Sequence, residues 1–273
     1  MNKLFVSDLD GTLLNAFHST DFIIFRGIKK LFKRGDSFAI ATGRNMRKEH
    51  IEHDFKDIKV YCIAMNGALI LNPLKEIIYE ARIDRSIIEN VLTNFPEIKF
   101  EFITRSSVLV NFDKKTAEGQ LDEANFFTKL LFKRFKELYM SEYRYDISNE
   151  EILNNDILKF NCKISNPEVK ERFDKYLLDN KDKLVNAAFD KRSYEITAAG
   201  VNKGVAIKKL AEILKVKNND IYVYGDGDND VKMLEMYENS YAPSNACENA
   251  KNAARYTLAD NKTYSVIRHM LKQ

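Results

Sequence analysis

The first strand-forming segment limits the possible folds of this chain more than any other part of the sequence. Residues 4–8 form a short apolar run that ends in two aspartates, Asp8 and Asp10, followed by Gly11. Side chains along a strand alternate between its faces, so Asp8 and Asp10 share a face at its carboxyl end. Because two close carboxylates repel each other, the pair predicts a Mg²⁺ site with a nucleophile and an acid/base partner, as phosphoryl transfer requires. The alternative is an ordinary Asp-Gly turn, in which the glycine only lets the chain leave the strand.

Apolar strands and amphipathic helices alternate at both ends of the chain. The predicted strands are 4–8, 37–41, 60–64 and 221–224, and the predicted helices are 22–34, 203–214, 230–237, 249–254 and 264–271. Alternation of this kind predicts a parallel sheet that is covered by helices.

The middle of the chain has a different pattern. Its strands, such as 100–103 and 159–164, alternate polar and apolar residues, which is typical of an antiparallel sheet with one solvated face. Helices are predicted at 83–95, 118–138 and 167–180. The first pattern returns near Tyr194, so the middle module is an insertion. The predicted fold class is therefore α/β. A Rossmann-like, doubly wound parallel-sheet core of residues 1–81 and 191–273 carries an inserted α+β module of residues 82–190.

Charge, hydropathy and cysteine spacing argue against several kinds of binding partner and indicate where in the cell the protein is found. The chain has 43 Lys and Arg against 40 Asp and Glu, a formal net charge of only +3, which argues against a nucleic-acid partner. No apolar run approaches the roughly 20 residues of a membrane-spanning helix, so no membrane partner is expected. The three cysteines are far apart, without metal-ligand spacing, and the chain enters a strand without a signal peptide. We therefore expect a cytoplasmic protein.

Three further groups of polar residues stand at predicted strand ends or helix starts. Thr42 and Gly43 follow the second strand and offer a hydroxyl and an amide that suit a phosphate oxygen, although an ordinary helix N-cap is the alternative. Lys203 begins a helix, where its charge opposes the helix dipole. Its charge either neutralises a phosphate beside a carboxylate nucleophile, or the residue is an ordinary surface lysine. The segment Gly225-Asp226-Gly227-Asp228-Asn229-Asp230 places three acids after a strand, which requires a cation or exposure to water. It lacks the offsets of a helix–loop–helix calcium site.

Together these motifs resemble the haloacid dehalogenase superfamily of phosphohydrolases, and most closely its Cof-type, class IIB branch. The resemblance spans nearly the whole chain, in the family's order. It rests on Asp-Leu-Asp-Gly-Thr-Leu-Leu, then Ala-Thr-Gly-Arg, Asn-Gly-Ala, Lys-Gly and Gly-Asp-Gly-Asp-Asn-Asp. In that branch an inserted cap follows the Asn-Gly-Ala motif, here Asn66-Gly67-Ala68. One later segment, 242–246, reads Ala-Pro-Ser-Asn-Ala where the family usually has a sequence like Met-Gly/Ala-Asn-Ala.

The resemblance implies a role for each matching residue. Asp8 would be the nucleophile that forms an aspartyl-phosphate, and Asp10 would protonate the leaving oxygen and then activate water. Mg²⁺ would be held by the Asp8 carboxylate, the Asp10 backbone carbonyl and Asp226. The phosphate would be bound by Thr42, Gly43, Lys203, Asn229 and the amide of Leu9. Arg44 and Asn66 would lie close by, without an assigned role.

The sequence therefore predicts a Mg²⁺-dependent phosphatase that acts on small phosphorylated metabolites, sugar phosphates foremost. A phosphomutase, or a sensor that binds phosphorylated metabolites without turnover, stays open as an alternative. A signalling receiver is disfavoured because the third strand, 60–64, has no phosphoacceptor aspartate at its end. The oligomeric state also stays open.

Overall fold

The computed structural model describes residues 1–273 except 1, 57, 123–140 and 188–192. The chain divides into two compact units, which are described separately. The core unit combines Met1–Glu80 with Gly200–Gln273, and the inserted unit is Ala81–Ala199.

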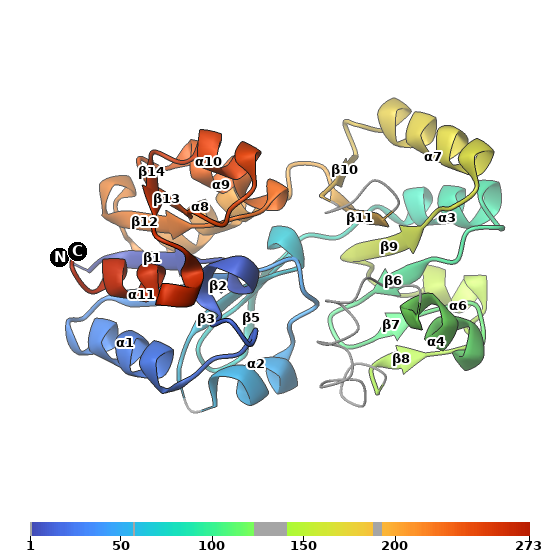
Figure 1. The fold of residues 1–273 in the computed structure, drawn as a ribbon. Coiled ribbons are helices and arrows are strands. Elements are labelled where there is room, and N and C mark those ends of the chain that lie inside the picture. Colours follow the sequence, from blue (N-terminus) through green and yellow to red (C-terminus); the bar gives the residue numbers. More distant parts are fainter. Residues whose placement is uncertain (1, 57, 123–140, 188–192) are drawn as a thin grey trace. The chain divides into compact units, whose positions relative to one another are not determined.

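The core unit is built on one sheet of eight described strands, in the order β14-β13-β12-β1-β2-β3-β4-β5 (Figure 1). The six strands from β14 to β3 are parallel, whereas β4 and β5 pair antiparallel at one edge. The strand bounds are Leu4–Ser7 (β1), Ser37–Ala41 (β2), Tyr61–Ala64 (β3), Leu69–Leu71 (β4), Ile77–Glu80 (β5), Ile221–Tyr224 (β12), Asn239–Pro243 (β13) and Tyr256–Leu258 (β14). The first strand of the sequence thus lies near the centre of the sheet, paired with β12 on one side and with β2 on the other.

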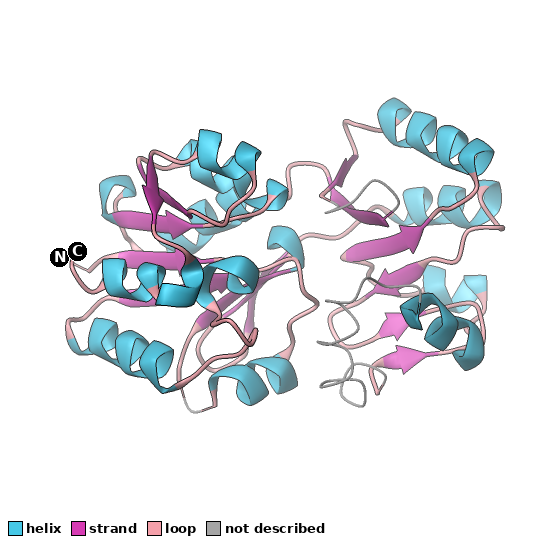
Figure 2. Cartoon of the chain, viewed as in Figure 1, coloured by secondary structure: helices cyan, strands magenta, loops and turns pink. Residues whose placement is uncertain are grey.

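Helices cover both faces of this sheet, as the doubly wound pattern predicts (Figures 1 and 2). On one face Leu4 and Val6 pack in a cluster with Ile207 of α8 and Leu234 of α9. Phe5 alternates to the other face, where α1 packs against β2 and α11. The helix bounds are Phe22–Lys33 (α1), Lys48–Phe55 (α2), Lys203–Leu214 (α8), Val231–Met236 (α9), Glu248–Ala253 (α10) and Ser265–Met270 (α11).

The inserted unit has its own sheet of six described strands, in the order β10-β11-β9-β6-β7-β8. All the pairs are antiparallel except β7 with β8. One face carries a core that includes Phe102, Phe160 and Ile196 and that packs against Phe173 of α7 and Ile87 of α3. The bounds are Glu101–Ile103 (β6), Val108–Leu109 (β7), Tyr143–Arg144 (β8), Lys159–Lys163 (β9), Leu184–Asn186 (β10), Ser193–Ala198 (β11), Arg85–Asn94 (α3), Lys114–Asp122 (α4), Asn149–Leu153 (α6) and Pro167–Asp179 (α7).

The predicted fold class is confirmed, but several details differ. The hairpin of β4 and β5, the strands β13 and β14, and the helices α2 and α6 were not predicted. The predicted helix 118–138 falls partly on α4, and residues 123–140 lie outside the described residues. We expected the return to the core at residue 191, whereas the units divide between Ala199 and Gly200. The reason is β11, which pairs with β9 and buries Tyr194 and Ile196 in the core of the inserted unit.

No helix in the described part of the chain is long and apolar enough to cross a membrane.

Candidate active site

The predicted site residues lie at the carboxyl ends of neighbouring parallel strands. Asp8 follows β1, Thr42 follows β2, and Asp226 comes two residues after β12. Register aligns these ends, because Ser7 lies beside both Ile40 and Tyr224. This edge is the place where open parallel sheets bind ligands.

The turn after β1 packs closely against the loop that carries Asp226. Residues Leu9–Leu13 form a distorted helical turn in which Gly11 has a φ of 77°. A side chain at Gly11 would place its Cβ 2.2 Å from Asp226 Oδ2, so only glycine fits there. The Thr12 hydroxyl also donates a hydrogen bond to Asp226 Oδ1, at 2.5 Å.

Lys203 lies at the centre of a buried ion cluster. Its ammonium group donates to Asp8 Oδ1 and to Asp230 Oδ1, each at 2.6 Å. The lysine is completely buried, and both carboxylates are almost completely so. These bonds explain why a lysine occupies the first position of α8 despite the helix dipole, because its charge neutralises carboxylates that burial would otherwise penalise.

The pKa values of these groups reflect burial and mutual repulsion. Burial raises the pKa of Asp8 well above its ordinary value; Lys203 opposes this shift, while Asp230, Asp226 and Asp10 add to it. Burial and the Asp230 carboxylate raise the pKa of Asp226 to about 7. Burial lowers the pKa of Lys203, but Asp230 and Asp8 outweigh it, so the net shift is upward. The site therefore carries more carboxylates than its single lysine neutralises, and a further cation would stabilise it.

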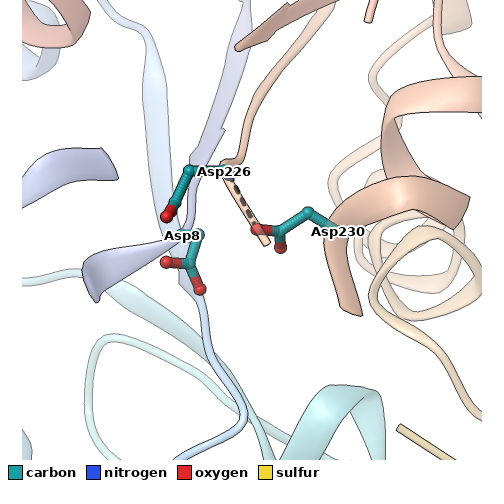
Figure 3. Close-up of side chains that lie close together, drawn as sticks. All are labelled: Asp8, Asp226 and Asp230. Atoms are coloured by element: carbon teal, nitrogen blue, oxygen red, sulfur yellow. Dashed lines mark hydrogen bonds between the residues drawn. The ribbon is translucent and has the colours of Figure 1, made fainter. Parts of the chain in front are cut away.

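Asp8, Asp226 and Asp230 offer carboxylate oxygens that all lie within 4.8 Å of one another (Figure 3). The carboxylate of Asp230 already accepts hydrogen bonds, since its Oδ2 accepts from the backbone N–H groups of Asp226 and Gly227 at 2.9 and 3.0 Å. Asp8 and Asp226 are therefore better placed than Asp230 to bind a cation. Hard carboxylate oxygens are the ligands that Mg²⁺ prefers, so this donor set fits that ion.

The Asp10 carboxylate faces Arg44. The guanidinium binds it through two nitrogens: Nε donates to Oδ2 at 2.7 Å, and Nη2 contacts Oδ1. The backbone N–H of Arg44 donates to the Thr42 hydroxyl at 3.1 Å, which leaves the proton of that hydroxyl for another acceptor. Arg44 therefore connects the predicted acid/base residue to the predicted phosphate-binding threonine.

Asn229 is bound by Asn66, which, like Arg44, had no assigned role in the sequence analysis. The Asn229 side-chain amide donates to Asn66 Oδ1 at 3.0 Å. Asn66 is buried and has a φ of 56°, directly after Met65 with a φ of 53°. Consecutive positive φ values outside glycine are strained, and such strain is concentrated at functional sites.

The structure thus brings the predicted site residues to one edge of the core sheet, with Leu9 and Gly43 beside them in the same loops. Sequence reasoning missed Asp230, which it quoted only as part of the acidic motif, and Thr12. A signal for Asp230 was available in its position, because it is the last acid of the motif and stands where a helix begins. Its carboxylate can therefore turn back to the preceding backbone N–H groups.

The chain resembles known proteins over nearly its whole length. A family model described as haloacid dehalogenase-like hydrolase matches residues 5–271. The chain is 28% identical to 5-amino-6-(5-phospho-D-ribitylamino)uracil phosphatase YwtE of Bacillus subtilis, covering 95% of this chain and 93% of that protein. Two solved structures have the same fold. One is a haloacid dehalogenase-like hydrolase from B. subtilis, with a TM-score of 0.82, 24% identity and 99% coverage of both chains. The other is a subclass IIB sugar phosphatase, with a TM-score of 0.74, 22% identity and 98% coverage of both.

Proposed function

Because the chain belongs to the haloacid dehalogenase-like hydrolase family, we propose that it is a Mg²⁺-dependent phosphatase that uses Asp8 as its nucleophile. The observation that carries this proposal is the Asp8 carboxylate at the end of a central strand, 2.6 Å from the Lys203 ammonium and beside Asp226. A carboxylate that attacks a phosphate dianion faces repulsion, and positive charge at this position reduces it.

In this proposal the reaction has two steps. An Asp8 oxygen attacks phosphorus while the ester P–O bond breaks, and Asp10 gives its proton to the leaving oxygen. Water then attacks the aspartyl-phosphate, Asp10 takes up the proton, and phosphate leaves with Asp8 restored. Thr42, Gly43, Lys203, Asn229 and the Leu9 amide would bind the phosphate oxygens. One group thus serves as acid and then as base, as a covalent route requires.

The residues that would hold Mg²⁺ are Asp8 and Asp226, with the backbone carbonyl of Asp10. A bound Mg²⁺ would supply charge stabilisation for the transferring phosphoryl group. The raised pKa of Asp226 supports this assignment, since it reflects negative charge in need of a cation.

We propose small phosphorylated metabolites as the substrates, with sugar phosphates first. The printed names of two similar proteins, a sugar phosphatase and a phosphatase of a phosphoribityl compound, support this class. They also favour hydrolysis over the phosphomutase and sensor alternatives. We propose that the inserted unit is the cap that selects the substrate. A cytoplasmic location is supported by three cysteines that are all unpaired, as in a reducing compartment.

The test is phosphate release from a panel of phosphorylated metabolites, with Mg²⁺ and with EDTA. Asp8→Asn keeps the shape of the side chain but removes its nucleophilic charge, so release should fall to background. Asp228→Asn is the matched control, because Asp228 is an exposed acid of the same loop as Asp226, and its activity should stay near that of the wild type. Full activity of Asp8→Asn would refute the nucleophile assignment. No release by the wild type, despite bound Mg²⁺, would favour the mutase or the sensor.

A further inference from the structure

The loop after β13 connects the two acid-bearing loops of the site. The Asn245 side-chain amide donates to the backbone carbonyl of Gly11 at 2.8 Å. Two residues later, the Cys247 backbone N–H donates to the carbonyl of Asp226 at 2.9 Å. One short loop therefore binds both the turn that carries Asp10 and the loop that carries Asp226.

The turn that carries Asp10 needs support from outside itself. Asp10 and Gly11 have φ/ψ values of −79°/124° and 77°/−8°, neither of which is helical. The carbonyl of Gly11 instead accepts from Asn245. At the end of the turn, the buried Asn261 side chain donates to the carbonyl of Leu14 at 3.0 Å.

These two asparagines are themselves connected. The backbone N–H of Asn261 donates to Asn245 Oδ1 at 3.0 Å. Asn245 therefore uses both ends of its amide, one as donor to the turn and one as acceptor from the Asn261 segment. This fixes which way the amide group faces, so its N–H group points toward Gly11.

We propose that Asn245 is a positioning residue, which holds the Leu9–Leu13 turn so that the Asp10 carboxyl group can protonate the leaving oxygen. The inference rests on the proposed phosphatase function. Within the segment 242–246, Asn245 keeps the asparagine of the usual family sequence, whereas Pro243 and Ser244 depart from it.

A comparison of two leaving groups isolates this role. Release of p-nitrophenolate, a weak base, needs little help from an acid, whereas release of a sugar alkoxide depends on protonation. The quantity kcat/KM reports steps through the first phosphoryl transfer when that step is irreversible. We would measure it for p-nitrophenyl phosphate and for the sugar phosphate that the wild type hydrolyses fastest.

Asn245→Ala removes the donor and the acceptor, and Asn245→Asp keeps an acceptor but loses the donor. General acids contribute about 10²- to 10⁴-fold, so partial misplacement of Asp10 should lower kcat/KM for the sugar phosphate by about 10- to 100-fold in both variants. The loss for p-nitrophenyl phosphate should be several times smaller. Ser244→Ala, at another exposed position in the same loop, should leave both substrates unaffected. Asn245 is exposed, so the melting temperatures of its variants should stay close to that of the wild type.

The outcomes separate this inference from the function on which it rests. Selective loss on the sugar phosphate supports the positioning role. Equal loss on both substrates, or no loss on either, overturns it while leaving the phosphatase intact. If the wild type hydrolyses neither substrate with Mg²⁺ present, the proposed function itself fails, and this inference fails with it.

Discussion

At the scale of single residues, the stability of the site depends on Lys203. Its ammonium group lies between Asp8 and Asp230, and all three side chains are buried. Breaking a buried ion pair by removing one partner leaves an uncompensated charge in a poorly solvated place, which costs much more than the loss of a surface pair.

Lys203→Met should therefore lower the free energy of unfolding by about 3–5 kcal/mol, measured by urea unfolding at pH 7 with EDTA. Adding Asp230→Asn should recover about 1 kcal/mol or more, because it removes one of the unpaired carboxylates. Lys232→Met, which breaks an exposed pair with Glu235, is the control and should cost about 0.5 kcal/mol or less. If the losses of stability from Lys203→Met and Asp230→Asn simply add in the double variant, the two side chains do not interact as a buried ion pair.

The raised pKa of Asp226 predicts how pH and Mg²⁺ act together. Between its ordinary value of 3.8 and about 7, the folded protein holds a proton that the unfolded chain has released. In metal-free protein, the stability that the extra proton on Asp226 contributes is therefore lost as pH rises through that range. Mg²⁺ competes with the same proton, so it should raise the melting temperature more at pH 8 than at pH 5. A Mg²⁺ effect that is equal at both pH values, or larger at pH 5, would contradict this.

The same residues mark the limit of prediction from sequence. Asp8 and Asp10 were identified because their spacing at the end of an apolar strand is informative, and Asp226 was identified through the family resemblance of its motif. The role of Asp230 was missed: its place at the start of a helix was a signal, but only the fold shows its carboxylate turned back to the N–H groups of Asp226 and Gly227 and bound to Lys203. The partners of Arg44 and Asn66 also required the fold, since Asp10 and Asn229 are far from them in the sequence.

At the scale of elements, the turn after β3 lies against the start of α8. A side chain at Gly67, whose φ is 107°, would place its Cβ 2.6 Å from the carbonyl oxygen of Asn202. Asn202 is the N-cap of α8, directly before Lys203. A residue that needs space in this turn would therefore displace the helix end that carries the lysine.

Gly67→Ala should lower both the melting temperature and kcat for this reason. Gly35→Ala is a matched control, because Gly35 also has a positive φ, 84°, but has no atom within 4 Å of the added Cβ. It should cost about 1–2 kcal/mol of backbone strain and leave kcat unchanged. Identical kcat values for the two variants would show that the contact with α8 does not matter.

Elements with a strong local signal were predicted closely. The bounds of α8, β2 and β12 agree with the predicted ones, because each is a clear periodic or apolar run with a polar boundary. The hairpin of β4 and β5 was missed because both strands are short and their pairing is decided by the edge of the sheet that they join. The assignment of β11 to the inserted unit also depended on pairing, in this case with β9.

At the scale of the whole molecule, the two compact units should respond differently to Mg²⁺. The acidic cluster belongs entirely to the core unit. Hydrogen exchange followed by mass spectrometry should therefore show added protection in residues 9–13 and 225–230 when Mg²⁺ is present. Exchange in β9 and β11 of the inserted unit should change little. Equal protection of β9 and β11 would contradict binding of Mg²⁺ by the acidic cluster of the core unit alone.

The position of β1 has a consequence for synthesis on the ribosome. Its partner β2 follows within the first 41 residues, but its other partner, β12, begins only at Ile221. At translation rates of about 5–20 residues per second, one edge of the nascent β1 waits roughly 10 to 40 seconds for its neighbour. During this wait an apolar strand has an unpaired edge, which is a hazard for aggregation. We expect ribosome-bound chains stalled before residue 221 to recruit chaperones to their N-terminal segment, and chains stalled well beyond β12 to release them.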